Sequence, residues 1–266
     1  MRARPWPVVL ALSLALCCAA CSTSSGASSS SATSTSPLDP AAIRAELAHA
    51  NAVTAIGDSV PSGTACDCTP YPQLTAADLT RFAGHPVTVS NDAMSGFQSG
   101  DVADQLRDDP DVIAHVETSQ VVLAEVGAND VAYSPSCGTN VSCYDAKLPS
   151  IEHNLTTIVQ RVHELTRGHE LTLLLLDYWS VWLGGQYAQA QGPAYVTAAD
   201  TVTDHVDTAI RNIAQSTGSV YVDLRTAFRG PNQSWDETHL LAPDGDHPNA
   251  EGHVRIARAI ADTVAA

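Results

Sequence analysis

From residue 40 onward, short apolar runs alternate with longer segments in which apolar positions recur every three or four residues. Short apolar runs are typical of buried strands, and the three-to-four spacing is typical of helices that cover a sheet. We therefore predict strands at 52–56, 86–90, 120–126, 171–176 and 219–224, and helices at 40–50, 71–82, 100–108, 149–167, 194–216 and 251–264.

This alternation predicts an α/β protein whose parallel sheet is covered by helices on both faces. Because crossovers between parallel strands are right-handed, the topology is restricted to doubly wound forms. Residues 39–266 suffice for one such domain, and we expect a single flavodoxin-like three-layer α/β/α domain with about five parallel strands. In such sheets the active site lies outside the carboxyl ends of the strands.

The first 38 residues have a different composition. Arg2 and Arg4 precede an apolar run at 8–16 and then small residues, which is the pattern of a secretory signal peptide over residues 1–20. The run is too short to span a bilayer as a helix, which needs about 20 apolar residues. A short buried helix is the alternative, but no partner segment follows.

Residues 22–36 are almost all Ser, Thr, Ala and Gly, which cannot form a core and predict a flexible tether. The preceding AAC resembles a bacterial lipobox, whose cysteine is lipidated and begins the mature chain, although Cys18 stands where that pattern usually has Leu. We expect an anchor on Cys21 and a tether over residues 21–38, on the extracellular side of the membrane. The alternative is a freely secreted chain.

The chain is strongly acidic, with 13 basic and 29 acidic residues and a net charge of −16. Loss of residues 1–20 would remove two arginines and no acid, leaving 11 basic residues and a net charge of −18. Such a surface repels phosphate backbones, so we expect no nucleic-acid binding. We expect a monomer that reaches the membrane only through a lipid on Cys21.

Apart from Cys21, four cysteines follow the signal segment, and an even number in an exported chain predicts disulfides. Cys137 and Cys143 would close a short loop and are the favoured pair, with Cys66 and Cys68 as a tighter second bridge. Pairing between the two loops is the alternative. A zinc site is the functional rival, but no histidine stands at metal-ligand spacing to either pair, so we expect no metal.

Polar blocks that contain glycine stand where predicted strands end or helices begin. Residues 57–59 (GDS) follow the first strand, 90–96 (SNDAMSG) the second and 127–130 (GAND) the third, and 244–249 (DGDHPN) precede the last helix. Each block alone is common in ordinary turns. Together, at the edge where parallel strands end, they predict one shared site.

These blocks contain the groups that acyl transfer needs. The Ser59 hydroxyl is too weakly acidic to attack unaided and needs a base, for which His247 is the candidate. Asp244 can accept the other imidazole N–H and fix the tautomer. Gly96 and Ser59 can each offer a backbone N–H, and Asn129 a side-chain N–H, to a developing oxyanion.

With these four blocks in this order, the chain resembles the SGNH (GDSL-type) hydrolase family over essentially the whole of residues 39–266. The resemblance implies nucleophile Ser59, oxyanion donors Gly96 and Asn129, orienting acid Asp244 and base His247. It also implies that the enzyme uses no metal or organic cofactor. Val60 stands where the family commonly has Leu, and the G-x-S-x-G elbow of ordinary α/β-hydrolases is absent.

Plainer roles are open for several of these residues. Ser59 can be a helix N-cap, Gly96 can mark close backbone packing, and Asn129 can close a turn. Asp246 competes with Asp244 as the partner of His247.

Other residues near the blocks also have two interpretations. We rank His253 below His247 as a base because the spacing places it on a solvent-facing side of the last helix, and His239 fits either a pocket or a loop. We interpret Asp58 as structural. Among the aromatic residues of 178–187, Trp179 and Trp182 either wall an acyl or sugar pocket or cover the edge of the core.

We therefore predict an exported serine esterase that cleaves carboxylic esters of lipids, acetylated sugars or short acyl chains through an acyl-Ser59 intermediate. An acyltransferase of the same fold would differ only in the acceptor. The rival from another class is a non-catalytic envelope lipoprotein that binds through this fold. That rival predicts a broken block, whereas all four blocks are whole.

Overall fold

The computed structural model describes residues 39–265. The signal peptide predicted at 1–20, the tether at 21–38 with Cys21, and the last residue lie outside the described residues. None of the helices within the described range combines the length and the hydrophobicity that crossing a bilayer requires.

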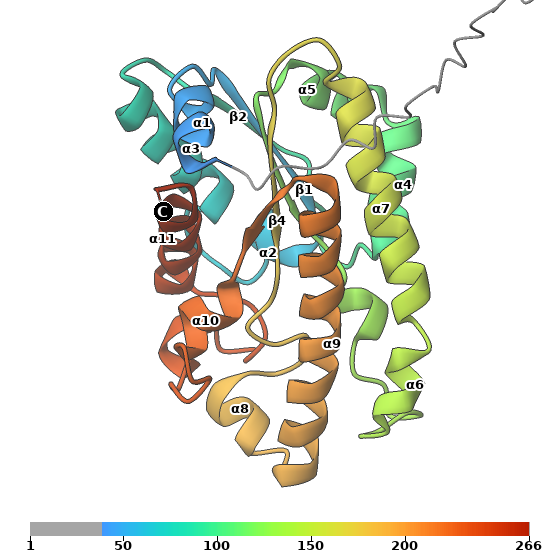
Figure 1. The fold of residues 1–266 in the computed structure, drawn as a ribbon. Helices are drawn as coiled ribbons and strands as arrows, with labels where there is room; N and C mark the ends of the chain where they lie inside the picture. The colour runs from blue at the N-terminus through green and yellow to red at the C-terminus, as the bar shows by residue number, and fades with distance from the viewer. Residues whose placement is uncertain (1–38, 266) are drawn as a thin grey trace, which may run out of the picture. The chain divides into compact units, whose positions relative to one another are not determined.

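Five parallel strands form one sheet in the order β2-β1-β3-β4-β5 (Figure 1). They are β1 (Ala52–Gly57), β2 (Thr88–Asn91), β3 (Val121–Glu125), β4 (Thr172–Leu176) and β5 (Val220–Val222). The strand order reverses between β1 and β3, which is the switch point where doubly wound sheets open a crevice for ligands. The expected single α/β domain with a five-stranded parallel sheet is confirmed.

Helices cover both faces of the sheet (Figure 1). One face carries α1 (Pro40–Leu47), α3 (Tyr71–Ala83) and α11 (Ala250–Ala265), and the other carries α4 (Ser99–Asp108), α5 (Pro110–Thr118), α7 (Leu148–Leu165) and α9 (Pro193–Thr217). Strands β3 and β4 are buried along their whole length, as expected for a parallel sheet with both faces covered.

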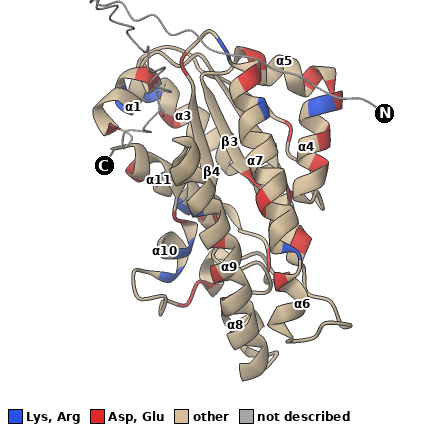
Figure 2. Cartoon of the chain, turned by 45° about the vertical axis from the view of Figure 1, so that its right-hand side comes forward, with Lys and Arg blue, Asp and Glu red and all other residues tan. Residues whose placement is uncertain are grey.

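The apolar spacing of α7 buries the side predicted from the sequence. Ile151, Leu155, Ile158 and Val162 are all buried, because residues three and four apart share one face of a helix. Acidic residues lie on the outer surface of the same layer, where Figure 2 shows red positions on α4, α5 and α7 and few blue ones.

The sequence prediction missed the shortest helices. These are α2 (Ser59–Ser62), α6 (Val141–Asp145), α8 (Gly185–Gln189) and α10 (Leu224–Arg229), with two 3₁₀ turns at Ala128–Val131 and Thr238–Leu240. Helix α5 was also missed, although Asp109 caps it and Pro110 begins it, which is an ordinary start signal. Strand β5 ends earlier than predicted because Asp223 caps α10.

Candidate active site

Ser59 stands on a sharp turn between β1 and α2. Gly57 ends the strand with φ of +143°, and a Cβ on it would lie 2.0 Å from the carbonyl oxygen of Glu125 on β3, so only glycine fits this close approach. Asp58, not Ser59, is the N-cap, because its Oδ1 accepts the N–H of Val60 at 3.0 Å. The Ser59 side chain is thereby left free of a capping role.

Asp58 has the structural role that we expected. Its carboxyl group is buried beneath Ser59, where Oδ2 accepts the hydroxyl of Tyr178 at 2.6 Å. Its backbone N–H donates to the Glu125 carbonyl at 3.1 Å. The turn that holds Ser59 is therefore tied to both β3 and the end of β4.

His247 pairs with Asp244 and not with the rival Asp246. The His247 Nδ1 lies 2.7 Å from Asp244 Oδ2, and Asp244 Oδ1 accepts the backbone N–H groups of both Asp246 and His247 at 3.1 Å. Partial burial acts to raise the pKa of Asp244, but these hydrogen bonds outweigh it and lower the pKa. Asp244 therefore stays ionised and fixes the imidazole with Nε2 as its free nitrogen.

Ser59, Asn129 and His247 line one cavity of about 380 Å³ at the carboxyl ends of the strands. Asp246 also lines it, and burial is the main cause that raises the pKa of its carboxyl. In the described part of the chain, the Ser59 hydroxyl makes no direct hydrogen bond to His247. Catalytic hydrogen bonds are often long without substrate and tighten in the complex.

Asn129 lies beside the segment that contains Gly96. Asn129 lies in the 3₁₀ turn after β3, and its Nδ2 donates to the carbonyl of Phe97, next to Gly96, at 2.9 Å. The cavity wall, as far as the described residues form it, includes Asn129 but not Gly96. A Cβ on Gly96 would meet nothing within 4 Å, so its φ of +84°, not close packing, favours glycine there.

Trp179 and Trp182 combine the two roles that the sequence left open. Both line the cavity, and both are almost fully buried. Trp179 stacks on Phe228 with ring centroids 4.2 Å apart, and Trp182 donates its Nε1–H to the carbonyl of Val131 at 2.7 Å. Rings held in this way form a rigid cavity wall and cover the edge of the core at once.

The placement predicted for His253 is wrong. Its side chain is fully buried, not solvent-facing, and its Nδ1 accepts the backbone N–H of Tyr71 at 3.2 Å. Burial lowers the pKa of His253 to about 4, which keeps it neutral. His239 is exposed, with its Nδ1 3.1 Å from the carbonyl of Asp236, and lies outside the lining of the cavity that the described residues form.

The cysteines form the two local pairs that we favoured. Cys137 joins Cys143 and Cys66 joins Cys68, with Cα atoms 5.8 and 5.1 Å apart. No histidine stands at metal-ligand spacing to either pair in the sequence, but the fold brings His253 within 4.8 Å of Cys66 and Cys68. This group does not fit a metal, because the two sulfurs are joined in a disulfide and the Nδ1 lone pair of His253 already accepts the Tyr71 N–H, which leaves the proton of the neutral ring on Nε2.

Four buried carboxyl groups beneath the site were not singled out from the sequence. Asp58, Glu125, Asp177 and Asp207 are all buried, and both carboxyl oxygens of Glu125 are without a hydrogen-bond partner among the described residues. Burial raises the pKa of Asp58 to about 6 and that of Asp177 to about 7, and it also raises the pKa values of Glu125 and Asp207 well above their usual range. The acid inside the apolar run QVVLAEV was the available signal for Glu125.

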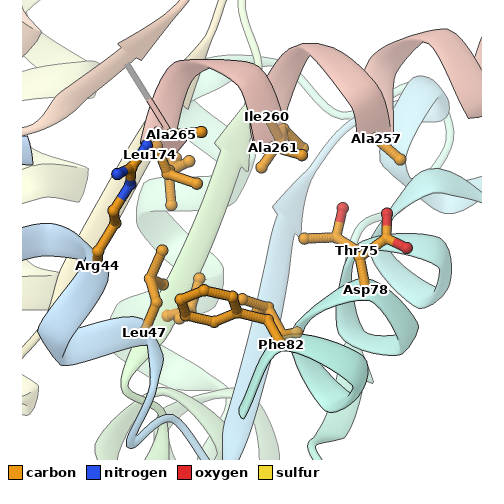
Figure 3. Close-up of a pocket in the computed structure, with 13 residues that line it drawn as sticks. Arg44, Leu47, Thr75, Asp78, Phe82, Leu174, Ala257, Ile260, Ala261 and Ala265 are labelled. Carbon is orange, nitrogen blue, oxygen red and sulfur yellow. The ribbon is translucent and has the colours of Figure 1, made fainter.

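A separate, almost wholly apolar cavity of about 260 Å³ lies between α1, α3 and α11. Figure 3 shows Leu47 and Phe82 on one side of it and Ala257, Ile260 and Ala261 of α11 on the other. Its lining shares no residue with that of the cavity at Ser59. It therefore takes no part in the chemistry at that serine.

The fold and this group of side chains define a class: doubly wound α/β proteins with serine, histidine and aspartate at the carboxyl edge of the sheet. The model of the GDSL-like Lipase/Acylhydrolase family matches residues 55–255. The chain belongs to this family and is a carboxylic ester hydrolase of the SGNH type. No curated protein matches the sequence.

Solved structures show the same fold at low sequence identity. The lipase Lip_vut3 from a goat rumen metagenome has a TM-score of 0.63 at 15% identity, over 80% of this chain and 96% of that one. The acetylxylan esterase Axe2 from Geobacillus stearothermophilus has a TM-score of 0.56 at 22% identity, over 80% and 94%. TesA has a TM-score of 0.56 at 17% identity, over 80% and 97%.

Replacement of Asp244 by Asn should lower kcat for p-nitrophenyl acetate by about 10²–10⁴-fold, because the amide no longer holds the imidazole in the productive tautomer. The control Asp246→Asn should lower kcat by less than about tenfold. Steady-state kinetics with both variants check this, and the reverse order would make Asp246 the orienting acid.

The buried carboxyl groups should make the protein less stable as the pH rises from about 6.5 to about 8. The pKa values of these groups are higher in the folded state than in the unfolded state, so the native state binds more protons over this pH range. The stabilisation that these protons give to the native state is lost as the groups ionise. His253, whose pKa is lowered, acts in the opposite sense only up to about pH 6.5. Urea unfolding should give a lower free energy of unfolding at about pH 8 than at about pH 6.5.

Asp177→Asn is the matched control for this pH dependence, because it removes one of the four groups. In the Asp177→Asn variant, the free energy of unfolding should fall less steeply as the pH rises. A free energy that instead increases between about pH 6.5 and about pH 8 would mean that these carboxyl groups are ionised at lower pH in the native state.

Proposed function

We propose that the chain hydrolyses carboxylic esters through an acyl-enzyme on Ser59. The observation that carries this proposal is the His247–Asp244 pair at 2.7 Å, with His247 in the wall of the same cavity as Ser59 and Asn129. In the first half-reaction, His247 Nε2 takes the hydroxyl proton as Ser59 Oγ attacks the ester carbonyl. The alcohol leaves with a proton from His247.

The negative charge of the tetrahedral intermediate needs hydrogen-bond donors that are already in place. The Ser59 N–H stands at the first position of α2, where helical N–H groups have no partner within the helix. The Asn129 amide donates one N–H to the carbonyl of Phe97 and keeps a second, and Asn129 lines the same cavity as Ser59. These observations support Ser59 and Asn129 as donors, whereas the Gly96 N–H stays a prediction from the sequence.

Water completes the reaction in the second half. His247 now removes a proton from the water molecule, which attacks the acyl carbonyl, and returns that proton to Ser59 Oγ as the acid is released. Asp244 stays ionised throughout and stabilises the imidazolium that forms twice in the cycle. An acceptor alcohol in place of water would give acyl transfer, and no feature of the cavity favours it.

Replacement of Ser59 by Ala should abolish covalent labelling by a fluorophosphonate and lower the hydrolysis of p-nitrophenyl acetate by about 10³-fold or more. Ser150→Ala, at an exposed serine at the start of α7, is the matched control and should leave both unchanged. If the wild-type protein is neither labelled nor active, the chain is a binding module that has kept the fold.

We also propose that the enzyme acts outside the cell, anchored by a lipid on Cys21 through the tether at 21–38. The basic start, the apolar run at 8–16 and the AAC sequence support this proposal, as do two disulfides in the folded domain.

The intact mass of the protein isolated from its native membrane checks the anchor. We expect a chain that begins at Cys21 and carries the added mass of acyl groups, and we expect Cys21→Ser to release the protein into the medium. A mass equal to that of the full 266 residues would contradict export.

A further inference from the structure

A polar cavity of about 230 Å³ lies beside the catalytic cavity and has no role in the mechanism above. It is formed by α8, the first turns of α9, the end of α10 and residues 233–237. Ser180 and Leu183 line both cavities, so the segment 180–183 is their common wall. The second cavity therefore lies next to the one at Ser59, with this segment between them.

Trp235 gives this cavity an exposed aromatic surface. Its side chain is 54% exposed. One face packs on Gly230, where a Cβ would lie 2.5 Å from the ring, and the Trp235 N–H donates to the carbonyl of Arg229 at 2.9 Å. The ring is held in place, and its partially negative π face suits the C–H groups of a sugar ring.

The polar wall contains buried groups that lack partners. Arg229 Nε and Gln233 Oε1 are buried and have no hydrogen-bond partner among the described residues. A native structure rarely leaves such atoms unsatisfied unless water or a ligand meets them. A hydroxyl group can donate to Gln233 and accept from Arg229, which is the pairing that a sugar offers.

The charges of the cavity point to a neutral ligand. Asp200, Asp236 and Glu237 line it against one basic residue, Arg229, which already contacts the carboxylates of Asp200 and Glu237. Hydrogen bonds from Thr238 and Gln186 lower the pKa of Asp236, which therefore remains an ionised acceptor. The excess of acids repels phosphate and carboxylate groups, and a mostly polar wall does not suit an alkyl chain.

We propose that this cavity binds neutral sugar residues, so that the alcohol part of the ester cleaved at Ser59 is a neutral oligosaccharide. This inference rests on the esterase function proposed for Ser59. Trp235 stacks on one sugar ring, and the side chains of Gln233, Arg229 and Asp236 bind its hydroxyl groups.

The experiment compares an acetylated xylotetraose with p-nitrophenyl acetate, which is too small to reach beyond the cavity at Ser59. Trp235→Ala should lower kcat/KM for the tetraose ester by roughly tenfold or more, mainly through KM, and change p-nitrophenyl acetate hydrolysis by less than about twofold. Trp235→Phe, which keeps an aromatic face, should recover part of the loss.

Phe82→Ala is the matched control, because Phe82 is 57% exposed and belongs to the separate apolar cavity of Figure 3. Phe82→Ala should leave kcat/KM for both esters unchanged. Saturation-transfer NMR of the tetraose ester on the Ser59→Ala variant measures binding without turnover, and Trp235→Ala in that background should weaken the signal.

Trp235→Ala could lower kcat/KM equally for both substrates, or could leave kcat/KM for the tetraose ester unchanged. Either result would contradict the proposed sugar site without contradicting the proposed esterase function. A wild-type enzyme that hydrolyses p-nitrophenyl acetate but does not bind the tetraose ester would do the same. Loss of the proposed function looks different: the wild type would hydrolyse neither ester and Ser59 would stay unlabelled.

Discussion

The close approach of β1 and β3 at the switch point of the sheet is the constraint on which the site depends. Gly57 lies against the Glu125 carbonyl so tightly that no side chain fits, and the Asp58 N–H donates to that same carbonyl. This contact ends β1 and starts α2 at Ser59, and it aligns Ser59 with Asn129, four residues after Glu125. Two parallel strands thus bring Ser59 and Asn129, the proposed nucleophile and a proposed oxyanion donor, to one place, because their carboxyl ends meet there.

Four buried carboxyl groups in the interior near this contact lower the stability of the fold. Asp58, Glu125, Asp177 and Asp207 are carboxyl groups in a region where an apolar core would be more stable. Asp58 has an evident use, since it caps α2 and binds Tyr178 under the nucleophile. Burial raises the pKa of Glu125, which favours its neutral form and so limits the negative charge in the interior near the proposed oxyanion site.

Two neighbouring cavities are available to bind different parts of a substrate. Trp179 and Trp182 are fixed by stacking and hydrogen bonding, so the part of the cavity wall that they form is rigid. The segment 180–183, which contains Trp182, lies between this cavity and the polar cavity that contains Trp235. Residues of α8, the first turns of α9, the end of α10 and residues 233–237 line that second cavity. The proposed ester of a neutral sugar matches a polar cavity in this position.

The sequence by itself determined the five strands, the long helices and the identity of the residues at the strand ends, because hydrophobic period and glycine-bearing turns are local properties. It also indicated Asp244, because an acid three residues before His247 in one turn can reach its ring. Only the tertiary structure decided between Asp244 and Asp246, buried His253 beside Cys66 and Cys68, and set Gly96 just outside the cavity wall. It alone placed Glu125 below Ser59 and brought Trp235 to a cavity next to the site. Those outcomes depend on how elements far apart in the chain pack, and burial, hydrogen-bond partners and desolvation arise only from that packing.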